Sequence, residues 1–377
     1  MMDIKSKFLD EILSCPDVEW KPLGQVLVRT KGTQITASKM KELHKDNAPL
    51  KIFAGGKTVA YFNFEDIPEK DINREPSIIV KSRGVIEFEY YDQPFSHKNE
   101  MWSYHSQDKN VEVKYVYYFL KCNEDYFQKI GSKMQMPQIA TPDTEKYLIP
   151  IPPLPIQQKI VDILDKFTKL TAELTAELTA ELTARKQQYE YYRDELLTFG
   201  DDVEWKELNQ VVRIRNGKDW KSLSVGRIPV YGTGGVMTYV DQASYDKVSV
   251  LIPRKGTITN IFYLEEPFWN VDTIFYTEIN EDMLVPKYFY YFMTNYDLVS
   301  LSTDSTRPSL TQSILNKIKI PVPSLDEQAR IVEILDKFDA LTNSITEGLP
   351  REIELRQQQY EYYRDLLLSF PKPDGVK

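Results

Sequence analysis

Two long stretches of the chain place hydrophobic residues every three or four positions, which is the spacing of an amphipathic helix. The first, residues 156–199, has no internal proline, and a helix of this length would extend over about 66 Å. The second, residues 325–370, contains Gly348-Leu349-Pro350, where we predict a kink or a break. Neither apolar stripe can stay exposed, so we expect the two helices to pair as an antiparallel coiled coil.

The blocks beside these helices have a different pattern. A short β-branched run precedes a basic turn that ends in glycine in PSIIVKSRG (76–84) and again in VSVLIPRKG (248–256). A compact aromatic segment, typical of a short buried helix, follows in VKYVYYFL (113–120) and PKYFYYFM (286–293). Each block is therefore predicted to be a small module that contains both strands and helices.

The chain contains an internal repeat. The sequence VEWK occurs twice, and two longer motifs recur after the same interval of 171 residues. A constant interval means that neither copy has a net insertion or deletion between the two longer motifs. The repeated segments are VEWK (18–21 and 203–206), IVDILDKF and IVEILDKF (160–167 and 331–338), and QQYEYYRDELLTF and QQYEYYRDLLLSF (187–199 and 358–370).

The repeat predicts an α+β fold with an internal pseudo-two-fold relation. Two globular α/β modules would be separated by two long helices that pair as an antiparallel coiled coil. The predicted order is an N-terminal helix (1–17), a first module (18–154), a central helix (155–200), a second module (201–323) and a distal helix (324–377), kinked near 348–350.

The central helix contains TAELTAELTAEL (171–182), three copies of a four-residue unit. Each unit would add about one helical turn, or about 6 Å, which is close to two base-pair rises of DNA. A solvated amphipathic helix and a simple tandem duplication explain much of this pattern. A ruler that sets a distance along DNA is the more specific interpretation.

Composition predicts a soluble cytoplasmic protein. The net charge is −9, but the two modules are close to neutral and the helical segments carry most of the acidity. No apolar run reaches the roughly 18 residues that a transmembrane helix needs. The two cysteines, Cys15 and Cys122, cannot form a disulfide framework or a metal cluster of their own.

No catalytic motif is complete. Gly56-Lys57-Thr58 resembles the end of a phosphate-binding loop, but Lys51 replaces the first glycine of that motif. Gly232-Thr233-Gly234-Gly235 lacks the third spaced glycine of a dinucleotide site. His97 and His105 do not have the spacing of a zinc protease. We therefore predict that the chain is not an enzyme by itself.

The two repeated helical regions, the TAEL tract and the doubled VEWK segment together resemble the specificity subunit of type I restriction-modification enzymes, with the type IC branch most similar. The resemblance extends over the whole architecture, is most specific in the helical regions and is weaker within the two modules. It implies that each module is a target recognition domain for one half of a bipartite DNA site. It also implies that the helices separate the two domains.

The resemblance implies several partners: double-stranded DNA, two modification subunits that methylate adenine, and restriction subunits that act as translocase and endonuclease. The complex would use S-adenosylmethionine, ATP and Mg²⁺ through these partners, and this chain would bind no cofactor or metal. The alternative interpretation is a coiled-coil scaffold whose two end modules bind proteins rather than DNA.

Candidate DNA-binding residues are the cations, short polar side chains and glycines of the predicted turns, which could contact phosphates or base edges. A solvated turn is the competing interpretation for each residue singly. In the first module they are Lys31, Lys57, Lys81, Ser82, Arg83, His97, Lys98, Lys133 and Gln135. In the second they are Arg213, Arg215, Lys218, Tyr231, Thr233, Gly234, Gly235, Arg254, Lys255, Thr257, Ser305, Thr306, Arg307, Ser309 and Gln312.

Two further groups of residues, the tyrosines of the modules and the apolar residues of the long helices, have other predicted roles. The tyrosines of 115–118 and 288–291 could stack on bases, but core packing is the favoured interpretation. The repeated helices are expected to make spacer and subunit contacts through Leu174, Leu178, Leu182, Tyr189, Tyr192, Leu335, Phe338, Tyr360 and Tyr363.

Overall fold

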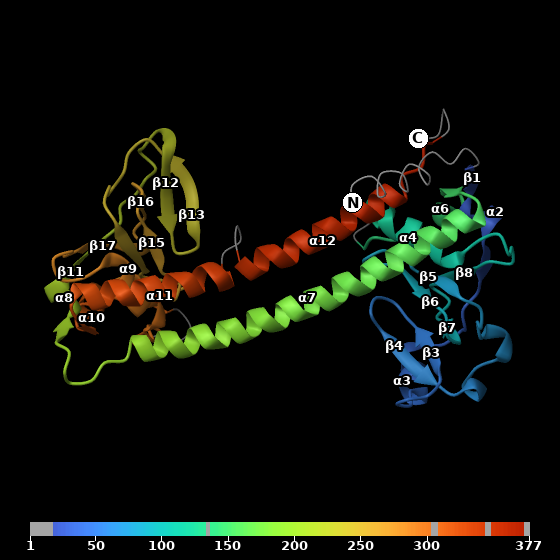
Figure 1. Cartoon of the computed structure of the whole chain (residues 1–377), viewed down its shortest axis with the longest axis horizontal. Helices are drawn as coiled ribbons and strands as arrows, with labels where there is room; N and C mark the ends of the chain where they lie inside the picture. Colours follow the sequence, from blue (N-terminus) through green and yellow to red (C-terminus); the bar gives the residue numbers. More distant parts are fainter. Residues whose placement is uncertain (1–17, 133–135, 303–307, 344–347, 373–377) are drawn as a thin grey trace, which may run out of the picture. The chain divides into compact units, whose positions relative to one another are not determined.

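The computed structural model describes residues 18–132, 136–302, 308–343 and 348–372 (Figure 1). The predicted N-terminal helix (1–17) lies outside the described residues. The chain forms two compact units: unit 1 contains residues 1–175 and 355–377, and unit 2 contains residues 176–354.

Unit 1 is built on two sheets and a short closing ribbon. The larger sheet has the strand order β2-β8-β5-β6, the smaller has β4-β3-β7, and β1 pairs with β9. The strands are β1 (Glu19–Pro22), β2 (Val28–Thr30), β3 (Leu50–Phe53), β4 (Val59–Phe62), β5 (Ser77–Lys81), β6 (Glu87–Tyr91), β7 (Phe95–His97), β8 (Trp102–His105) and β9 (Leu148–Ile151). The helices are α2 (Leu23–Val26), α3 (Ala37–Leu43), η1 (Phe64–Asp66), η2 (Glu69–Asp71), α4 (Val113–Cys122), α5 (Glu124–Gly131) and α6 (Thr141–Glu145).

Unit 2 repeats this topology. Its sheets have the orders β11-β17-β14-β15 and β13-β12-β16, and β10 pairs with β18. The strands are β10 (Trp205–Glu207), β11 (Val212–Arg215), β12 (Val225–Gly232), β13 (Gly235–Val240), β14 (Ser249–Pro253), β15 (Phe262–Leu264), β16 (Trp269–Asn270), β17 (Ile274–Ile279) and β18 (Lys319–Pro321). The shorter helices are α8 (Leu208–Val211), α9 (Pro286–Asn295) and α10 (Gln312–Leu315).

The two topologies match strand for strand. β5 and β14 hold the same position in the larger sheet, and α4 and α9 follow at the same point of the chain. In each smaller sheet the first hairpin is antiparallel, and its leading strand also pairs in parallel with a later strand. The predicted α+β fold with an internal repeat is confirmed. Segments that match in the sequence form equivalent strands and helices in the two units.

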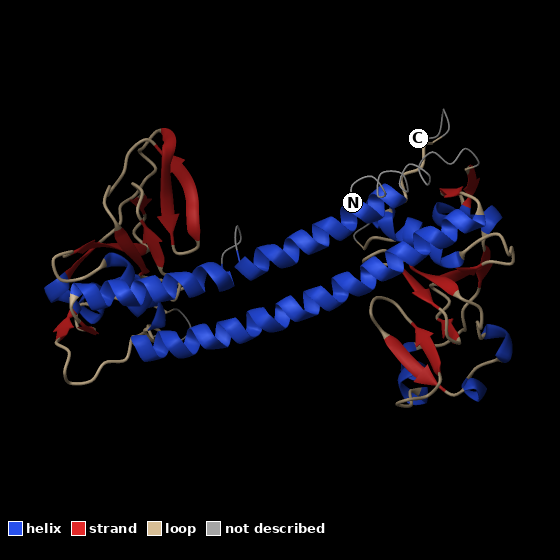
Figure 2. Ribbon diagram, viewed as in Figure 1, coloured by secondary structure: helices blue, strands red, loops and turns tan. Residues whose placement is uncertain are grey.

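The long helices also follow the repeat. α7 (Leu154–Leu196) is continuous over 43 residues (Figure 2), which confirms the predicted central helix. The distal helix is divided into α11 (Leu325–Asn343) and α12 (Gly348–Leu367), as the Gly-Leu-Pro sequence predicted. Gly348 has a φ of +82°, and a Cβ there would lie 2.5 Å from the carbonyl oxygen of Ala340. A side chain at Gly348 would therefore both strain the backbone there and collide with α11.

A pair of antiparallel helices belongs to each unit. In unit 1 the start of α7 packs against the end of α12, where the Phe167 and Tyr363 rings lie 5.8 Å apart. In unit 2 the end of α7 packs against α11, where the Tyr192 and Phe338 rings stack 5.7 Å apart. The aromatic residues of the repeated motifs therefore form the contact between paired helices.

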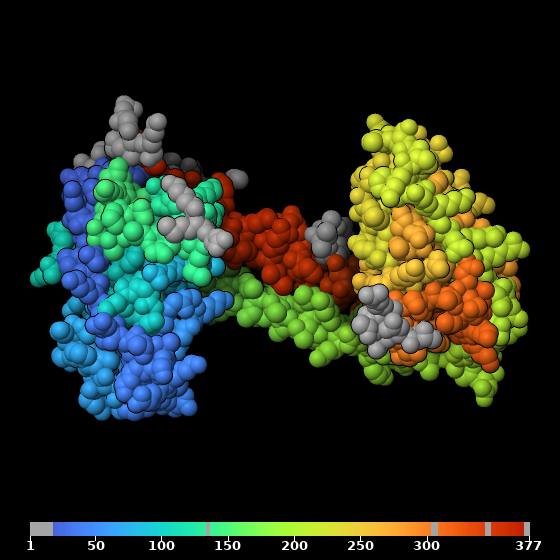
Figure 3. All heavy atoms as spheres, turned by 180° about the vertical axis from the view of Figure 1, so that it is seen from behind, coloured from blue at the N-terminus to red at the C-terminus, as the bar shows by residue number. Residues whose placement is uncertain are grey.

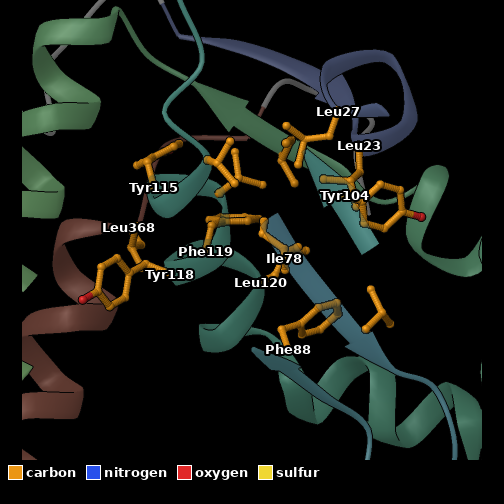
Figure 4. Packing of buried hydrophobic residues seen from close by; sticks show 14 of the residues in the cluster. Leu23, Leu27, Ile78, Phe88, Tyr104, Tyr115, Tyr118, Phe119, Leu120 and Leu368 are labelled. Atoms are coloured by element: carbon orange, nitrogen blue, oxygen red, sulfur yellow. The ribbon is translucent and has the colours of Figure 1, made fainter. Parts of the chain in front are cut away.

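Each unit has its own core. In unit 1, α4 covers the larger sheet, so that Phe119 and Leu120 meet Ile78 of β5 (Figure 4). Leu368, at the end of the chain's last helical segment, belongs to the same cluster. In unit 2, α9 packs in the same way against β14, and Leu197 takes the position of Leu368 in the repeat.

Candidate nucleic-acid interface

The basic turns predicted from the sequence occupy equivalent places in the two units. In unit 1, β5 leads into Ser82-Arg83-Gly84, and in unit 2, β14 leads into Arg254-Lys255-Gly256. Gly84 and Gly256 have φ values of +76° and +79°, a conformation that favours glycine. The two turns therefore keep the same backbone shape although their side chains differ.

Each basic turn is held against the segment that precedes α6 or α10. Arg83 forms an antiparallel bridge with Gln138, and Lys255 forms the equivalent bridge with Ser309. In unit 2 the Leu310 amide donates to the Arg254 carbonyl at 2.8 Å. The predicted candidates Arg254, Lys255 and Ser309 are thus brought together.

The glycine-rich hairpin turn of unit 2 lies beside the same basic turn. The Asn260 side-chain amide donates to the Thr233 carbonyl at 2.8 Å, which links residues 232–235 to the turn after β14. Gly235, with a φ of +106°, completes the tight connection between β12 and β13. Thr233, Gly234, Gly235, Lys255 and Thr257 therefore belong to one surface, on which Gly234, Lys255 and Thr257 are exposed.

Sequence reasoning missed the outer side chains of the β12–β13 hairpin. Val236, Met237 and Tyr239 are 46%, 60% and 52% exposed, and they stand on the edge strand β13 of the smaller sheet. In the space-filling view the yellow atoms of this part of the chain lie at the outside of unit 2 (Figure 3). Apolar groups beside a basic turn can contact thymine methyl groups in the major groove. The signal in the sequence was a glycine turn followed by apolar residues that do not alternate.

The remaining candidates of unit 2 have mixed surroundings. Arg213 and Lys218 are exposed, whereas Arg215 forms an ion pair with Glu278 at 2.9 Å. Tyr231 is half-buried against the Phe262 ring. The Gln312 side chain donates to Asn216 at 3.3 Å. Arg215 is exposed as well, but its guanidinium is engaged by Glu278, so Arg213 and Lys218 are better suited to a phosphate contact.

Among the described candidates of unit 1, three cations are exposed: Arg83 on the basic turn, Lys57 on the β3–β4 hairpin and Lys31 after β2. Lys98 is half-buried and forms an ion pair with Glu100 at 2.7 Å. Burial opposes the charge of Glu100, but Lys98 outweighs it, so the pKa of Glu100 lies below its usual value.

Three candidates of unit 1 need correction. Lys81 is not free, because its ammonium binds Glu89 at 3.0 Å and Glu87 at 3.2 Å across β5 and β6. Burial opposes this charge, but the two carboxylates outweigh it and the pKa of Lys81 is raised. Ser82 is buried and donates to the Glu100 carbonyl at 2.9 Å. Neither side chain faces the surface in the way the sequence suggested.

His97 is the third correction. Its side chain is fully buried, with Nδ1 3.1 Å from the Lys98 carbonyl and Nε2 3.2 Å from the Ser103 hydroxyl. Since a carbonyl only accepts, Nδ1 carries the proton and Nε2 accepts from Ser103. Burial lowers the pKa of His97, which favours this neutral ring. His97 is therefore a packing residue of unit 1, and not a group on the candidate DNA-binding surface.

Five candidates lie outside the described residues: Lys133, Gln135, Ser305, Thr306 and Arg307. The aromatic helices, by contrast, are fully described. Tyr115 and Tyr288 are completely buried, and Tyr118 and Tyr291 are nearly so. The favoured interpretation as core residues is confirmed for these four tyrosines, whereas Tyr117 and Tyr290 are half-buried and pack against the same cores.

Five of the nine residues expected to make spacer and subunit contacts line two equivalent grooves, namely Leu174, Tyr192, Phe338, Tyr360 and Tyr363. The groove of unit 1, between α7 and α12, has a volume of about 480 Å³, and that of unit 2, between α7 and α11, about 690 Å³. The five equivalent pairs, unit 1 first, are Ile163 and Ile334, Phe167 and Phe338, Gln359 and Gln188, Tyr363 and Tyr192, and Leu367 and Leu196.

The other predicted contact residues lie on the same helices. Leu174 and Tyr360 line the groove of unit 1, Leu178 and Leu182 are half-buried on α7, and Leu335 is buried in the core of unit 2. Tyr189 packs against Phe338 in unit 2, and burial raises its pKa to about 12.

Within the described residues, no group of histidine, cysteine, aspartate and glutamate side chains could hold a metal ion. Among the same residues, no helix combines the length and apolar character that a membrane span requires.

Comparison with known proteins places these features in a family. Residues 17–184 and 200–355 each match the type I restriction modification DNA specificity domain. The chain belongs to this family. The two matched regions contain the two modules, each followed by a large part of its helical segment.

Full-length relatives agree with the family match. The chain is 36% identical to the EcoR124I/EcoR124II type I restriction enzyme specificity subunit of Escherichia coli, over 98% of both chains. It is 34% identical to a putative type I restriction enzyme specificity subunit of Haemophilus influenzae, over 96% of this chain and 98% of the relative. The fold resembles the type I S subunit from M. genitalium, with a TM-score of 0.54, 20% identity and coverage of 95% of this chain and 97% of that one.

Proposed function

We propose that the chain is the non-catalytic subunit that gives a type I restriction-modification complex its DNA sequence specificity. Each unit reads one half of a bipartite site. The observation that carries this proposal is the duplicated topology with different reading surfaces. Arg83 in one unit and Arg254-Lys255 in the other stand on equivalent turns, each of which ends in a glycine of positive φ.

Sequence reading requires both phosphate and base contacts. Exposed cations such as Lys57 and Lys218 are suited to phosphates, which fix the position of a protein on the duplex. Cations on a braced turn, such as Arg83 and Lys255, can reach guanine in the major groove. Because the two units carry different side chains at these positions, they recognise different bases.

The helices set the distance between the two half-sites. The TAEL tract lies inside α7, so each unit of the tract adds about 6 Å of helix. A continuous helix transmits such a change in length from one module to the other. The gap between the half-sites therefore depends on the number of TAEL units.

The two equivalent grooves are docking sites for two copies of the modification subunit. The repeat has kept five lining positions in both units, four of them aliphatic or aromatic, and a repeated surface suits two copies of one partner. The partners supply S-adenosylmethionine, ATP and Mg²⁺ chemistry, and they add phosphate contacts that a chain of net charge −9 needs. Restriction subunits join this complex.

Docking can be tested with one exposed residue of each groove. Leu170 (52% exposed) lines the groove of unit 1, and Tyr192 (38% exposed) lines that of unit 2. We expect Leu170→Asp or Tyr192→Asp to leave one bound modification subunit instead of two, measured by native mass spectrometry of the co-expressed complex. Lys169→Ala, a neighbouring exposed position on α7, is the control and should keep two. Two bound copies in both groove variants would refute this docking site.

The experiment that tests the function is co-expression with a modification subunit, followed by mapping of adenine methylation across the host genome by single-molecule sequencing. A split motif with a fixed gap is the expected result. Methylation at a single unsplit motif would contradict reading by two units. No new methylation, with a folded modification subunit shown to be bound, would instead favour a protein-binding scaffold.

A further inference from the structure

The same set of polar contacts fastens each module to its long helix. In unit 1, Asp165 of α7 accepts from the Lys114 ammonium at 2.7 Å and from the Tyr118 hydroxyl at 2.5 Å, both from α4. In unit 2, Asp336 of α11 accepts from Lys287 at 2.8 Å and from Tyr291 at 2.5 Å, both from α9. We call each Lys-Tyr-Asp set a helix joint.

A buried glutamine reinforces each joint from about two helical turns earlier on the long helix. Gln157 at the start of α7 accepts from the Glu112 amide at 2.9 Å and donates to the Asn110 and Pro152 carbonyls. Gln328 at the start of α11 makes the equivalent bonds with the Val285 amide and the Met283 and Pro323 carbonyls. Both glutamine side chains are completely buried, so these bonds fix where the module helix begins relative to the long helix.

Aromatic contacts repeat in the same way. The Lys114 ammonium lies 5.3 Å from the Tyr90 ring centre, and Lys287 lies 5.7 Å from that of Tyr263. Tyr90 stands on β6 and Tyr263 on β15, which hold the same edge of matching sheets. Each joint therefore links the sheet, the module helix and the long helix.

Stability alone does not explain why both copies keep these polar groups. A partly buried ion pair can often be replaced by apolar side chains of similar volume without loss of stability. Charge-assisted hydrogen bonds, however, are short and directional, so they specify one orientation. Between the two units the reading turns have changed, yet the joint residues and their contacts are the same.

We propose that Asp165 and Asp336, through their joints, are positioning residues that fix the angle of each module on its helix and thereby enforce the gap between half-sites. This inference rests on the proposed DNA-reading function. Adding one base pair to the gap moves a half-site by about 3.4 Å and turns it by about 35°. A module that could tilt on its helix would tolerate such a change, whereas a module held by the joint would not.

The test measures gap selectivity separately from base selectivity. The chain is co-expressed with a modification subunit and a plasmid library in which the two half-sites are separated by every gap within a few base pairs of the native one. Adenine methylation is read by single-molecule sequencing. For Asp336→Ala and Asp165→Ala we expect about a tenfold rise in methylation at gaps one base pair away, relative to the native gap, with unchanged half-site bases.

Two further variants keep the test decisive. Tyr291→Phe and Tyr118→Phe keep the ring but remove one hydrogen-bond donor, and they replace the alanine variants if those fail to fold. For them we expect a smaller rise in methylation at gaps one base pair away from the native gap. Lys337→Ala is the control, because Lys337 adjoins Asp336 but forms its ion pair with Glu333 of the same helix.

Native gap selectivity in folded Asp336→Ala and Asp165→Ala complexes would overturn the proposal. So would an equal loss of methylation at every gap, since that is the result of destabilisation alone. If the complex that contains the unsubstituted chain methylates no split site, the result contradicts the proposed function and does not bear on the joints.

Discussion

Lys255 and Arg83 are exposed, and each stands on a turn whose backbone is held by a bridge to a neighbouring segment. Lys255 is bridged to Ser309, and Arg83 to Gln138. A braced backbone loses little freedom when the side chain binds, so such a cation contributes strongly to recognition.

We therefore expect Lys255→Glu to relax or weaken recognition of only the half-site that unit 2 reads. The expected cost is about 1–3 kcal/mol, as for loss of one base contact. Arg83→Glu should do the same for the other half-site, and Lys319→Glu, on the exposed face of β18, is the control. The measurement is the information content of each half-site in the methylated motif. Equal relaxation of both half-sites by either variant would contradict reading by separate units.

Residue identity alone predicted these turns but not the surroundings of every candidate. The Lys-Ser-Arg-Gly sequence indicates a basic turn, yet Ser82 is satisfied by the Glu100 carbonyl and His97 by the Ser103 hydroxyl. The Glu100 carbonyl reaches Ser82 because β5 pairs with β8, a strand distant in the chain. His97 and Ser103 are only six residues apart, but they stand on strands of two different sheets. Local pattern carries no information about such pairing, so burial of Ser82 and His97 could not be foreseen.

At the scale of elements, periodicity and repeat were sufficient. The unbroken spacing of apolar residues predicted α7, and Gly348 with Pro350 predicted the separation of α11 from α12. Matching segments predicted matching strands, since PSIIVKSRG and VSVLIPRKG became β5 and β14. The order of strands within each sheet depends on contacts between distant segments, and the sequence pattern did not contain it.

The TAEL tract leads to a prediction at this scale. Deletion of residues 175–178 removes one TAEL repeat. It shortens α7 by about 6 Å, which is close to two base-pair rises of DNA. We expect the methylated motif to keep both half-site sequences and to have a shorter gap. Glu177→Gln, which keeps the length of the tract, is the control and should leave the gap unchanged. A change in the half-site bases, or an unchanged gap after deletion, would argue against a spacer role.

At the scale of the whole molecule, the repeat closes each unit with the end of a long helix, which comes from a distant part of the chain in unit 1 and directly precedes the module in unit 2. Leu368 and Phe370, at the chain's last helical segment, belong to the core of unit 1, and the Trp20 indole donates to the Pro371 carbonyl at 2.9 Å. Leu197, at the end of α7, belongs to the core of unit 2. Leu197 and Leu368 are equivalent positions of the repeated motif.

This arrangement makes the effects of two identical substitutions separable. Leu368 is 4% exposed and Leu197 is 6% exposed, so truncation of either to alanine should cost about 2–5 kcal/mol. Because the two side chains lie in different cores, Leu368→Ala should lower hydrogen-exchange protection in α4 and β5 of unit 1 and leave α9 and β14 protected. Leu197→Ala should give the reverse pattern, which makes each variant the control for the other. If either substitution lowered hydrogen-exchange protection in both units, the two units would unfold as one cooperative body. Independent reading of the two half-sites could then not rest on independent stability of the two units.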